Sequence, residues 1–301
     1  MIARTRMPTL LCLGFGYSAR HYVTGFGMRF ARVVGTVRTR DKASGIDADG
    51  IEAHVFDGLA RPEVADAIGS CDAILVSAPP NESGDPVLAA FADTLAGAPN
   101  LRSVVYLSTV GVYGNHDGAW VDEKSAPNPT NARSRARLTA EAAWQSFGAR
   151  AGKSVAVLRL AGIYGPGRNA LAQLAFGTAK RIVKPGQVFS RIHVGDIGQV
   201  IDAAFARPAN GIFNVSDDEA APPQDVVAFG AELLRVPAPP EIPFAEAAKD
   251  LSPMALSFYT GCRRVRNDRI KSELGIRLRY PTYREGLRAL HAAGEGVRNR
   301  L

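Results

Sequence analysis

A glycine-containing segment near the amino terminus, residues 11–22 (LCLGFGYSARHY), constrains the fold more than any other part of the chain. An apolar run precedes Gly14, Gly16 follows two positions later, and Ala19 three positions after that. A strand, a tight glycine turn and a helix in this order present backbone N–H groups and a helix amino terminus to a pyrophosphate. The pattern Gly-x-Gly-x-x-Ala predicts a dinucleotide site, although an ordinary glycine-rich turn has the same short signature.

The rest of the first half alternates between strands and helices at a spacing typical of a parallel sheet. The predicted strands cover 31–37, 51–57, 73–80 and 102–108, and the predicted helices cover 61–69 and 86–97. Nearly continuous apolar strands are expected where helices cover both faces of a sheet. We therefore predict an α/β fold with a doubly wound parallel sheet, a Rossmann fold.

The end of the second predicted strand is basic, because Arg38 and Arg40 follow it directly. In a dinucleotide fold this strand end faces the adenosine ribose, where an acid binds the 2′-hydroxyl of NAD and an Arg suits the 2′-phosphate of NADP. The sequence favours NADP(H) over NAD(H); the alternative is that both Arg side chains simply face solvent. Further residues expected along the dinucleotide, at the turn and at the ends of the third and fourth strands, are Tyr17, Ser18, Asp57, Ser77, Ala78 and Pro79.

The charge and the cysteines bear on the class of protein. The net charge is +7, and eleven Lys and Arg against four Asp and Glu lie from residue 261 onward, so the excess belongs to the carboxyl-terminal part. This part has no nucleic-acid-binding motif, so we expect no nucleic-acid partner. The 3 cysteines are far apart, which predicts neither a disulfide framework nor a metal site. Apolar runs of strand length and the lack of a signal-peptide pattern predict a cytoplasmic protein without a membrane partner.

Four collinear segments resemble the extended short-chain dehydrogenase/reductase (SDR) superfamily, the NAD(P)-dependent epimerase/dehydratase group. They are 103–114 (SVVYLSTVGVYG), 157–169 (VLRLAGIYGPGRN), 191–200 (RIHVGDIGQV) and 211–219 (GIFNVSDDE). The resemblance implies an NAD(P)-binding domain over 1–165, and a region over 166–301 that completes the sheet and forms a smaller substrate lobe. Helices are expected at 196–206, 224–235, 267–274 and 282–292. Since SDR proteins commonly pair through the helix after the fifth strand, a homodimer is among the arrangements that the resemblance allows.

In that family a Ser or Thr, a Tyr and a Lys carry out proton transfer beside the nicotinamide. By the resemblance, Thr109 occupies the first position, whereas Arg133 and Arg137 stand at the Tyr and Lys positions, with Glu141 matching a family Glu. A guanidinium group cannot act as an acid or base near neutral pH. Arg137 is still expected to reach the ribose, as is Gly162, which follows the sixth strand.

Two interpretations of the Arg pair remain open. On one face of a helix, Arg133 and Arg137 would form a fork for a carboxylate or phosphate of a small, anionic substrate; alternatively, they are solvated side chains of a site that has lost activity. Three residues are candidates for a substitute proton donor: Tyr113, Tyr164 and His193. Together with Thr109, they are also the residues expected to contact the substrate. The chain is thus either an atypical NADP(H)-dependent oxidoreductase or epimerase, or a non-catalytic NAD(P)-binding sensor or assembly protein.

Overall fold

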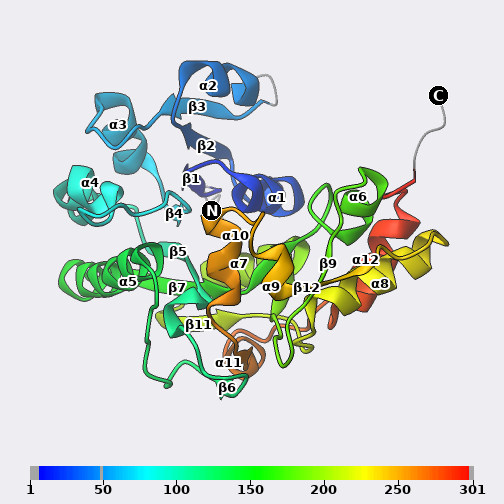
Figure 1. Cartoon of the computed structure of the whole chain (residues 1–301). Helices are drawn as coiled ribbons and strands as arrows, with labels where there is room; N and C mark the ends of the chain where they lie inside the picture. Colours follow the sequence, from blue (N-terminus) through cyan, green and yellow to red (C-terminus); the bar gives the residue numbers. More distant parts are fainter. Residues whose placement is uncertain (1–6, 48–49, 298–301) are drawn as a thin grey trace.

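The computed structural model describes residues 7–47 and 50–297, and its centre is a seven-stranded parallel sheet (Figure 1). The strands are β1 (Thr9–Leu13), β2 (Arg32–Val37), β3 (Glu52–Val55), β4 (Ala73–Val76), β5 (Ser103–Thr109), β7 (Ser154–Leu160) and β11 (Gly211–Val215). Their order is β11-β7-β5-β4-β1-β2-β3. The direction of winding reverses between β1 and β4, and at such a point the carboxyl ends of the strands leave a ligand crevice.

Helices cover both faces of this sheet, as the sequence predicts. On one face lie α1 (Tyr17–Phe26), α2 (Arg40–Asp47) and α7 (Val194–Ala206), and on the other α3 (Pro62–Ser70), α4 (Pro86–Gly97) and α5 (Ala132–Ala151) (Figure 1). Alternate side chains of each strand serve the two faces: Leu10 and Cys12 pack toward α1, whereas Leu11 and Leu13 pack in the cluster below α3 and α4. The doubly wound α/β prediction is confirmed.

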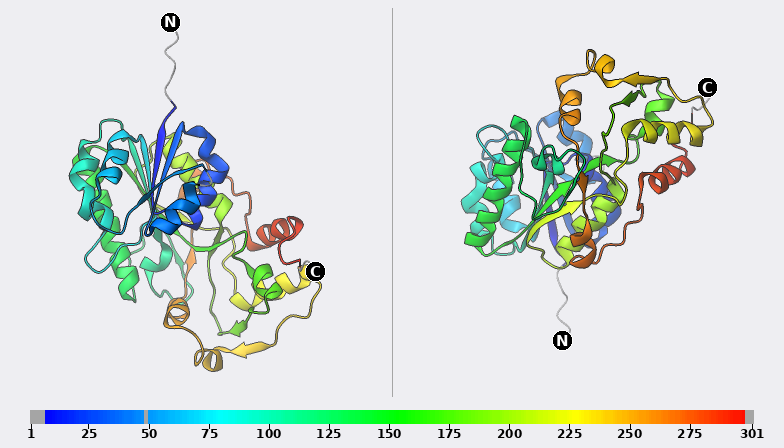
Figure 2. Two further views of the ribbon diagram at one scale, coloured as in Figure 1. Left: turned by 90° about the horizontal axis from the view of Figure 1, so that it is seen from above. Right: turned by 60° about the horizontal axis from the view of Figure 1, so that its bottom comes forward.

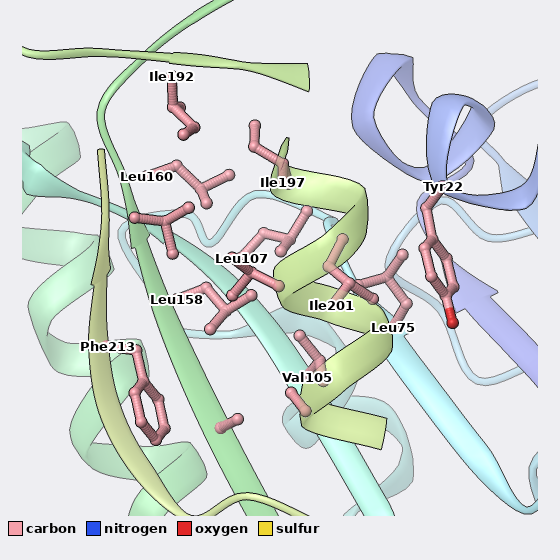
Figure 3. Close-up of a cluster of buried hydrophobic side chains, with 14 of the residues drawn as sticks. Tyr22, Leu75, Val105, Leu107, Leu158, Leu160, Ile192, Ile197, Ile201 and Phe213 are labelled. Atoms are coloured by element: carbon pink, nitrogen blue, oxygen red, sulfur yellow. The ribbon is translucent and has the colours of Figure 1, made fainter. Parts of the chain in front are cut away.

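The apolar layer beneath α7 shows how the carboxyl-terminal half is joined to the sheet (Figure 3). Ile197 and Ile201 of α7 are fully buried, and they lie in one cluster with the inward side chains of β4, β5 and β7. The other labelled members of this cluster are Tyr22, Leu75, Val105, Leu107, Leu158, Leu160, Ile192 and Phe213. Full burial of one such aliphatic side chain stabilises the fold by about 1.5–3 kcal/mol.

Two of the predicted strands are shorter than expected. The fourth strand ends at Val76 rather than at residue 80, because the N–H groups of Ser77 and Ala78 both donate to the carbonyl of Leu13, each at 2.9 Å. The chain therefore turns over the end of β1 instead of continuing along β5. The third strand covers Glu52–Val55 rather than 51–57.

The remaining elements lie outside the seven-stranded sheet. They are η1 (Gly27–Arg29), η2 (Val110–Tyr113), β6 (Trp120–Val121), β8 (Gly162–Tyr164), α6 (Ala170–Ala175), β9 (Arg181–Val183), β10 (Arg191–His193), α8 (Pro223–Leu234), β12 (Glu241–Pro243), α9 (Phe244–Ala247), α10 (Pro253–Tyr259), β13 (Arg264–Val265), α11 (Asp268–Ser272) and α12 (Tyr283–Ala292). Beyond residue 165, α7 and β11 complete the main sheet, whereas α6, α8 and α12 share a separate apolar cluster. Figure 2 shows the segment with β12 and α9 as an outer arm. Within the described ranges, every helix is too short or too polar to span a bilayer.

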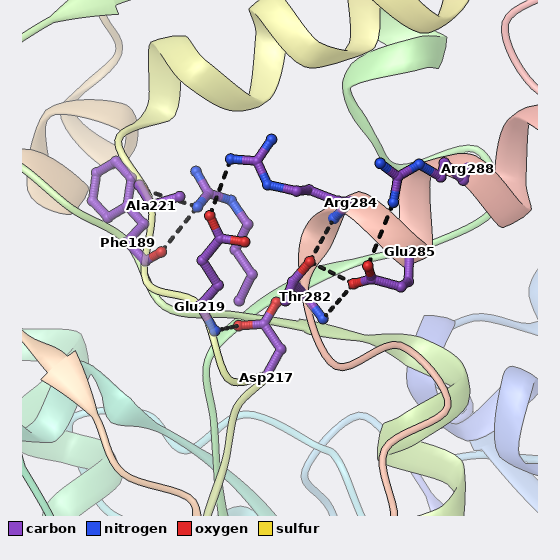
Figure 4. A network of polar contacts seen from close by, with 9 residues as sticks. Phe189, Asp217, Glu219, Ala221, Thr282, Arg284, Glu285 and Arg288 are labelled. Carbon is purple, nitrogen blue, oxygen red and sulfur yellow. Dashed lines mark hydrogen bonds and ion pairs between the residues drawn. The ribbon is translucent and has the colours of Figure 1, made fainter.

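Polar contacts join the exit of β11 to the start of α12 (Figure 4). Arg284 pairs with Glu219 at 3.2 Å across 65 positions of sequence. Thr282 and Glu285 form a capping box at the start of α12, with Thr282 Oγ1 donating to Glu285 at 2.5 Å. Such partly exposed pairs stabilise a fold by at most about 1 kcal/mol each, so their main effect is to orient the two segments.

A buried ion pair fastens α5 to the sheet. Arg159 of β7 donates to Glu141 of α5 through Nη2 at 2.7 Å and Nε at 3.1 Å, and both side chains are only 2% exposed. Ser108 of β5 donates to the same carboxylate at 2.5 Å, and the guanidinium lies 4.8 Å from the ring of Tyr113. Burial opposes the charge of Arg159, but the bonds to Glu141 hold the pKa of its guanidinium above the usual value.

We expect Glu141→Gln to lower the free energy of unfolding by about 3–5 kcal/mol, because it leaves the buried Arg159 charge unpaired. The control is Glu52→Gln, which removes the partner of the exposed Arg32. That loss should stay below about 1 kcal/mol in the same urea-unfolding experiment. Equal losses in the two variants would contradict the structural importance of the buried pair.

Candidate functional site

The glycine turn is held rigidly between two neighbouring strands. Gly14 has a φ of +93°, and a Cβ atom there would lie 2.7 Å from the backbone nitrogen of Ala78, so only glycine fits. Its N–H donates to Thr36 Oγ1 at 2.9 Å, and its carbonyl accepts from Ser77 Oγ at 2.5 Å. The turn is therefore tied to β2 on one side and to the loop after β4 on the other.

The amino terminus of α1 is open to a ligand. Gly16 is the N-cap residue, no side chain caps the helix, and no atom lies within 4 Å of a Cβ placed there. Tyr17 and Ser18 are half-buried in the first turn, and Ala19 is buried against the sheet. Unpaired N–H groups at a helix start favour an anion, so this arrangement can hold a pyrophosphate. The Tyr17 hydroxyl donates to the carbonyl of Pro166 at 3.0 Å, which joins the turn to the loop after β8.

The residues predicted for the ribose ends are exposed around this turn. Arg38 and Arg40 are exposed beyond the end of β2, and neither has an ion-pair partner within the described residues. Asp57 instead pairs with Arg61 at 2.7 Å, and that bond lowers the pKa of its carboxyl. Pro79 and Gly162 are exposed at the start of the segments after β4 and β7, while Ala78 is buried.

Two hydroxyl groups lie together where β5 ends. Thr109 Oγ1 accepts from the N–H of Gly111 at 3.0 Å, so its own proton is available to a ligand. A Cβ on Gly111 would lie 3.0 Å from Ser134 Oγ and 3.2 Å from Thr109 Oγ1, so the two hydroxyls flank this glycine. Ser134 was not among the predicted site residues; its signal is its place at the start of α5, three residues after the N-cap Asn131.

The two arginines of α5 have different surroundings. Arg137 Nη1 donates to the carbonyl of Leu107 at 2.7 Å and to the hydroxyl of Tyr106 at 3.1 Å. Burial raises the pKa of Tyr106 to about 12, and the nearby charge of Arg137 offsets only part of this rise. Arg133 is exposed at the start of the helix. The structure thus places Arg137 against β5, beside the end of β4, and does not bring the two guanidinium groups to a common partner.

The hydroxyl groups of the two tyrosines proposed as substitute acids are bonded to other parts of the fold. Tyr113 is fully buried and donates to Asn214 Oδ1 at 2.8 Å. Tyr164 donates to the carbonyl of Thr282 at 3.4 Å. Burial raises the pKa of both phenols, which makes proton donation at neutral pH harder.

His193 is enclosed between aromatic rings. Its Nδ1 accepts from the N–H of Gly195 at 3.0 Å and caps α7, which assigns the proton to Nε2. Nε2 is buried without a hydrogen-bond partner, and the ring centroids of Tyr164 and Tyr280 lie 5.2 and 4.0 Å away. Burial lowers the pKa of His193 to about 4, with smaller contributions from His21 and Arg279, so the imidazole is neutral at neutral pH.

Two half-buried arginines with backbone carbonyl partners were not predicted as site residues. Arg191 Nη1 donates to the carbonyls of Phe189 and Ala221, at 2.9 and 3.0 Å. Arg263 Nη1 donates to the carbonyl of Gly114 at 2.5 Å. Burial lowers the pKa of both guanidinium groups. Arg263 belongs to the basic excess from residue 261 onward, which gave no location for it within the fold.

Two hollows in the surface lie away from the glycine turn. One of about 290 Å³ is bordered by residues 123–127 and by Glu141 and Arg159. Another of about 520 Å³ lies along the outer side of α1, between Arg20 and Ile51. We therefore locate the site by its residues rather than by these two hollows.

The chain matches the NAD dependent epimerase/dehydratase family over residues 31–216. Among solved structures, a functionally unknown conserved protein from Silicibacter pomeroyi DSS is 49% identical, with a TM-score of 0.87 over 96% of this chain and 99% of that one. Human epimerase family protein SDR39U1, solved with NADPH, is 19% identical, with a TM-score of 0.70 over 94% and 99% of the two chains. At that identity the likeness shows the fold alone.

A Streptomyces protein named 3-diazoavenalumate denitrifying reductase is 32% identical over 139 residues. This match covers 44% of the present chain and 45% of the reductase, so the chain spans less than half the length of that relative.

The enclosed His193 makes stability depend on pH. In the unfolded chain the imidazole takes up a proton below its ordinary pKa of 6.5, whereas in the folded protein it stays neutral down to about pH 4. The contribution of the neutral His193 to the free energy of unfolding is complete above pH 6.5, the pKa in the unfolded chain, and is lost as the pH falls towards about 4, the pKa in the folded protein. We expect a loss of roughly 2 kcal/mol by about pH 5.

His193→Asn should remove this dependence, because Asn is also a good helix N-cap and does not titrate. Urea unfolding of the variant and the parent across this pH range gives the difference between their free energies of unfolding. The contributions of the other titrating groups cancel in this difference. Parallel pH profiles for the variant and the parent would refute the assignment.

Proposed function

The chain belongs to the NAD dependent epimerase/dehydratase family, and we propose that it is an NADP(H)-dependent reductase that works without the family's Tyr/Lys pair. The observation that carries the proposal is the combination at the strand ends: an open dinucleotide turn beside a hydroxyl group, Thr109, whose proton is free. Arg133 and Arg137 occupy the positions at which the family places Tyr and Lys.

The preference for NADP(H) is supported by the basic end of β2. Arg38 is exposed there without a carboxylate partner, so it is available for a 2′-phosphate. The human neighbour of the same fold was solved with NADPH.

The chemistry follows from which groups are present near Thr109. When bound, the reduced nicotinamide supplies the hydride. Epimerisation and dehydration also require proton transfers at carbon or oxygen, and a positioned acid or base typically contributes about 10²–10⁴-fold to such steps. The hydroxyls of Tyr113 and Tyr164 are bonded elsewhere, and the N–H of His193 is enclosed. Reduction is therefore the reaction that this site supports best.

A suitable substrate is one that accepts hydride without being protonated first. Cationic carbon or nitrogen electrophiles have this property, because the incoming hydride neutralises their charge. Thr109 and Ser134 can orient such a group by hydrogen bonds. The Streptomyces relative is named as a reductase of a diazo compound, which agrees with this class of acceptor.

A non-catalytic sensor is the second candidate, favoured by the contacts of the two arginines. Arg137 Nη1 is committed to β5, and Arg133 has no hydrogen-bond or ion-pair partner among the described residues. Such a protein would bind the dinucleotide tightly and leave it unreacted.

Calorimetric titration with NADPH and NADH tests the cofactor. We expect tighter binding of NADPH, and we expect Arg38→Ala to reduce that preference by about 10-fold or more, because a charge-assisted fork to the 2′-phosphate is lost. The control is Arg32→Ala, a substitution at the opposite end of β2. Unchanged discrimination in the Arg38 variant would refute its role.

Single-turnover stopped-flow at the nicotinamide absorbance tests the reaction. We expect NADPH to reduce an iminium or arenediazonium ion at a rate that does not vary with pH near neutrality, and to leave simple ketones unreduced. A bell-shaped pH dependence with a ketone would contradict the mechanism. Tight NADPH binding without absorbance change for any probe would favour the sensor.

A further inference from the structure

Arg263 is a cation for which the structure provides no counter-charge. It lies between α10 and β13, where Nη1 donates to the carbonyl of Gly114 and Nε is buried without any partner. No carboxylate of residues 7–47 or 50–297 forms an ion pair with it. Burial lowers the pKa of its guanidinium group, and smaller contributions from Cys262 and Tyr113 raise it.

The other enclosed guanidinium groups differ in this respect. Arg159 is paired with Glu141, and Arg191 has Asp217 and Glu219 in its surroundings. An enclosed charge without a partner is expensive unless something compensates it. An anionic ligand at Arg263 would supply that compensation.

The position of Arg263 relates it to the proposed reaction site. Gly114 follows Thr109 by five residues through η2. The segment around Arg263 lies between the chain that follows β5 and the chain that precedes β10. On one side, the N–H of His116 donates to the carbonyl of Cys262 at 2.9 Å. On the other, the N–H of Val265 donates to Ser190 Oγ at 3.1 Å.

Gln187 provides a second unsatisfied group at the same place. Its Nε2 donates to the carbonyl of Gly261 at 3.0 Å, whereas its Oε1 is buried without a partner in a side chain only 3% exposed. A Cβ on Gly261 would lie 2.8 Å from Arg263 Nη1, so Gln187 and Arg263 adjoin the same glycine. Buried polar atoms normally have partners, and two neighbouring exceptions mark a place where a ligand can supply them.

We propose that Arg263 is an anion subsite, which binds a carboxylate or phosphate carried by a substrate whose reacting atom accepts hydride beside Thr109. Gln187 Oε1 accepts a hydrogen bond from a hydroxyl or N–H of the same molecule. The inference rests on the proposed reductase function, and it assigns to the substrate an anionic group in addition to its cationic acceptor. It places anion recognition at Arg263 rather than at the α5 arginines, since Arg133 is exposed and Arg137 Nη1 is bonded to β5, so the two do not form a fork.

The test is calorimetric titration of the NADPH-loaded protein with hydrocinnamate, phenyl phosphate and the neutral hydrocinnamamide. The first two separate carboxylate from phosphate, and the amide has the same shape as hydrocinnamate without its charge. We expect at least one anion to bind about 10-fold or more tightly than the amide. Arg263→Gln should abolish this preference, because Gln keeps a donor for the Gly114 carbonyl but removes the charge.

Arg264→Gln is the matched control, since Arg264 is adjacent and also donates to a glycine carbonyl, that of Gly118. It should retain the preference for the anion. Equal binding of amide and anions, or the same loss in both variants, would overturn the subsite. If Arg263→Gln weakens NADPH binding instead, the charge serves the cofactor and the inference is wrong. Failure of the parent protein to bind NADPH would refute the proposed function rather than the subsite alone.

Discussion

The buried pair of Glu141 and Arg159 is the interaction on which the geometry of the site depends. It joins α5 to β7, and through Ser108 it also reaches β5. Ser134 and Arg137 lie on the same helix, so their distance from the end of β5 is set by this attachment. Replacing a buried ion pair with apolar residues is often neutral for stability. The importance of this pair therefore lies in fixing the position of one helix over one strand.

The fold could be predicted because its signals are local. Apolar runs of strand length, the Gly14–Ala19 turn and the strand–helix alternation each act over a few residues, and together they define the parallel sheet and the place of Thr109 at the end of β5. The directions of the polar side chains could not be predicted. Tyr113 bonds to Asn214 and Tyr164 to Thr282, and such pairings across more than 100 residues leave no periodic trace in the sequence.

The basic excess of the carboxyl-terminal part illustrates the same limit. Composition gives the sum of the charges but not their partners. In the structure several of these cations face carboxylates: Lys271 meets Asp218 at 2.6 Å and Arg269 meets Glu273 at 2.6 Å. Arg263, in the same stretch of sequence, has no carboxylate partner in the part of the chain that the structure describes. Only the three-dimensional arrangement distinguishes a solvated or paired cation from one that is held at the crevice uncompensated.

The position of β11 has a consequence for the order in which the chain folds. β7 pairs with β11 in parallel, yet the chain between them contains α6, the small strands β8–β10 and all of α7. During synthesis the outer edge of β7 stays unpaired until residues 211–215 emerge. Asn214, the partner of Tyr113, arrives with them. Late closure of a long-range parallel ladder is intrinsically slow and leaves an open strand edge exposed to other chains. Newly made protein is therefore most prone to aggregate before β11 has docked.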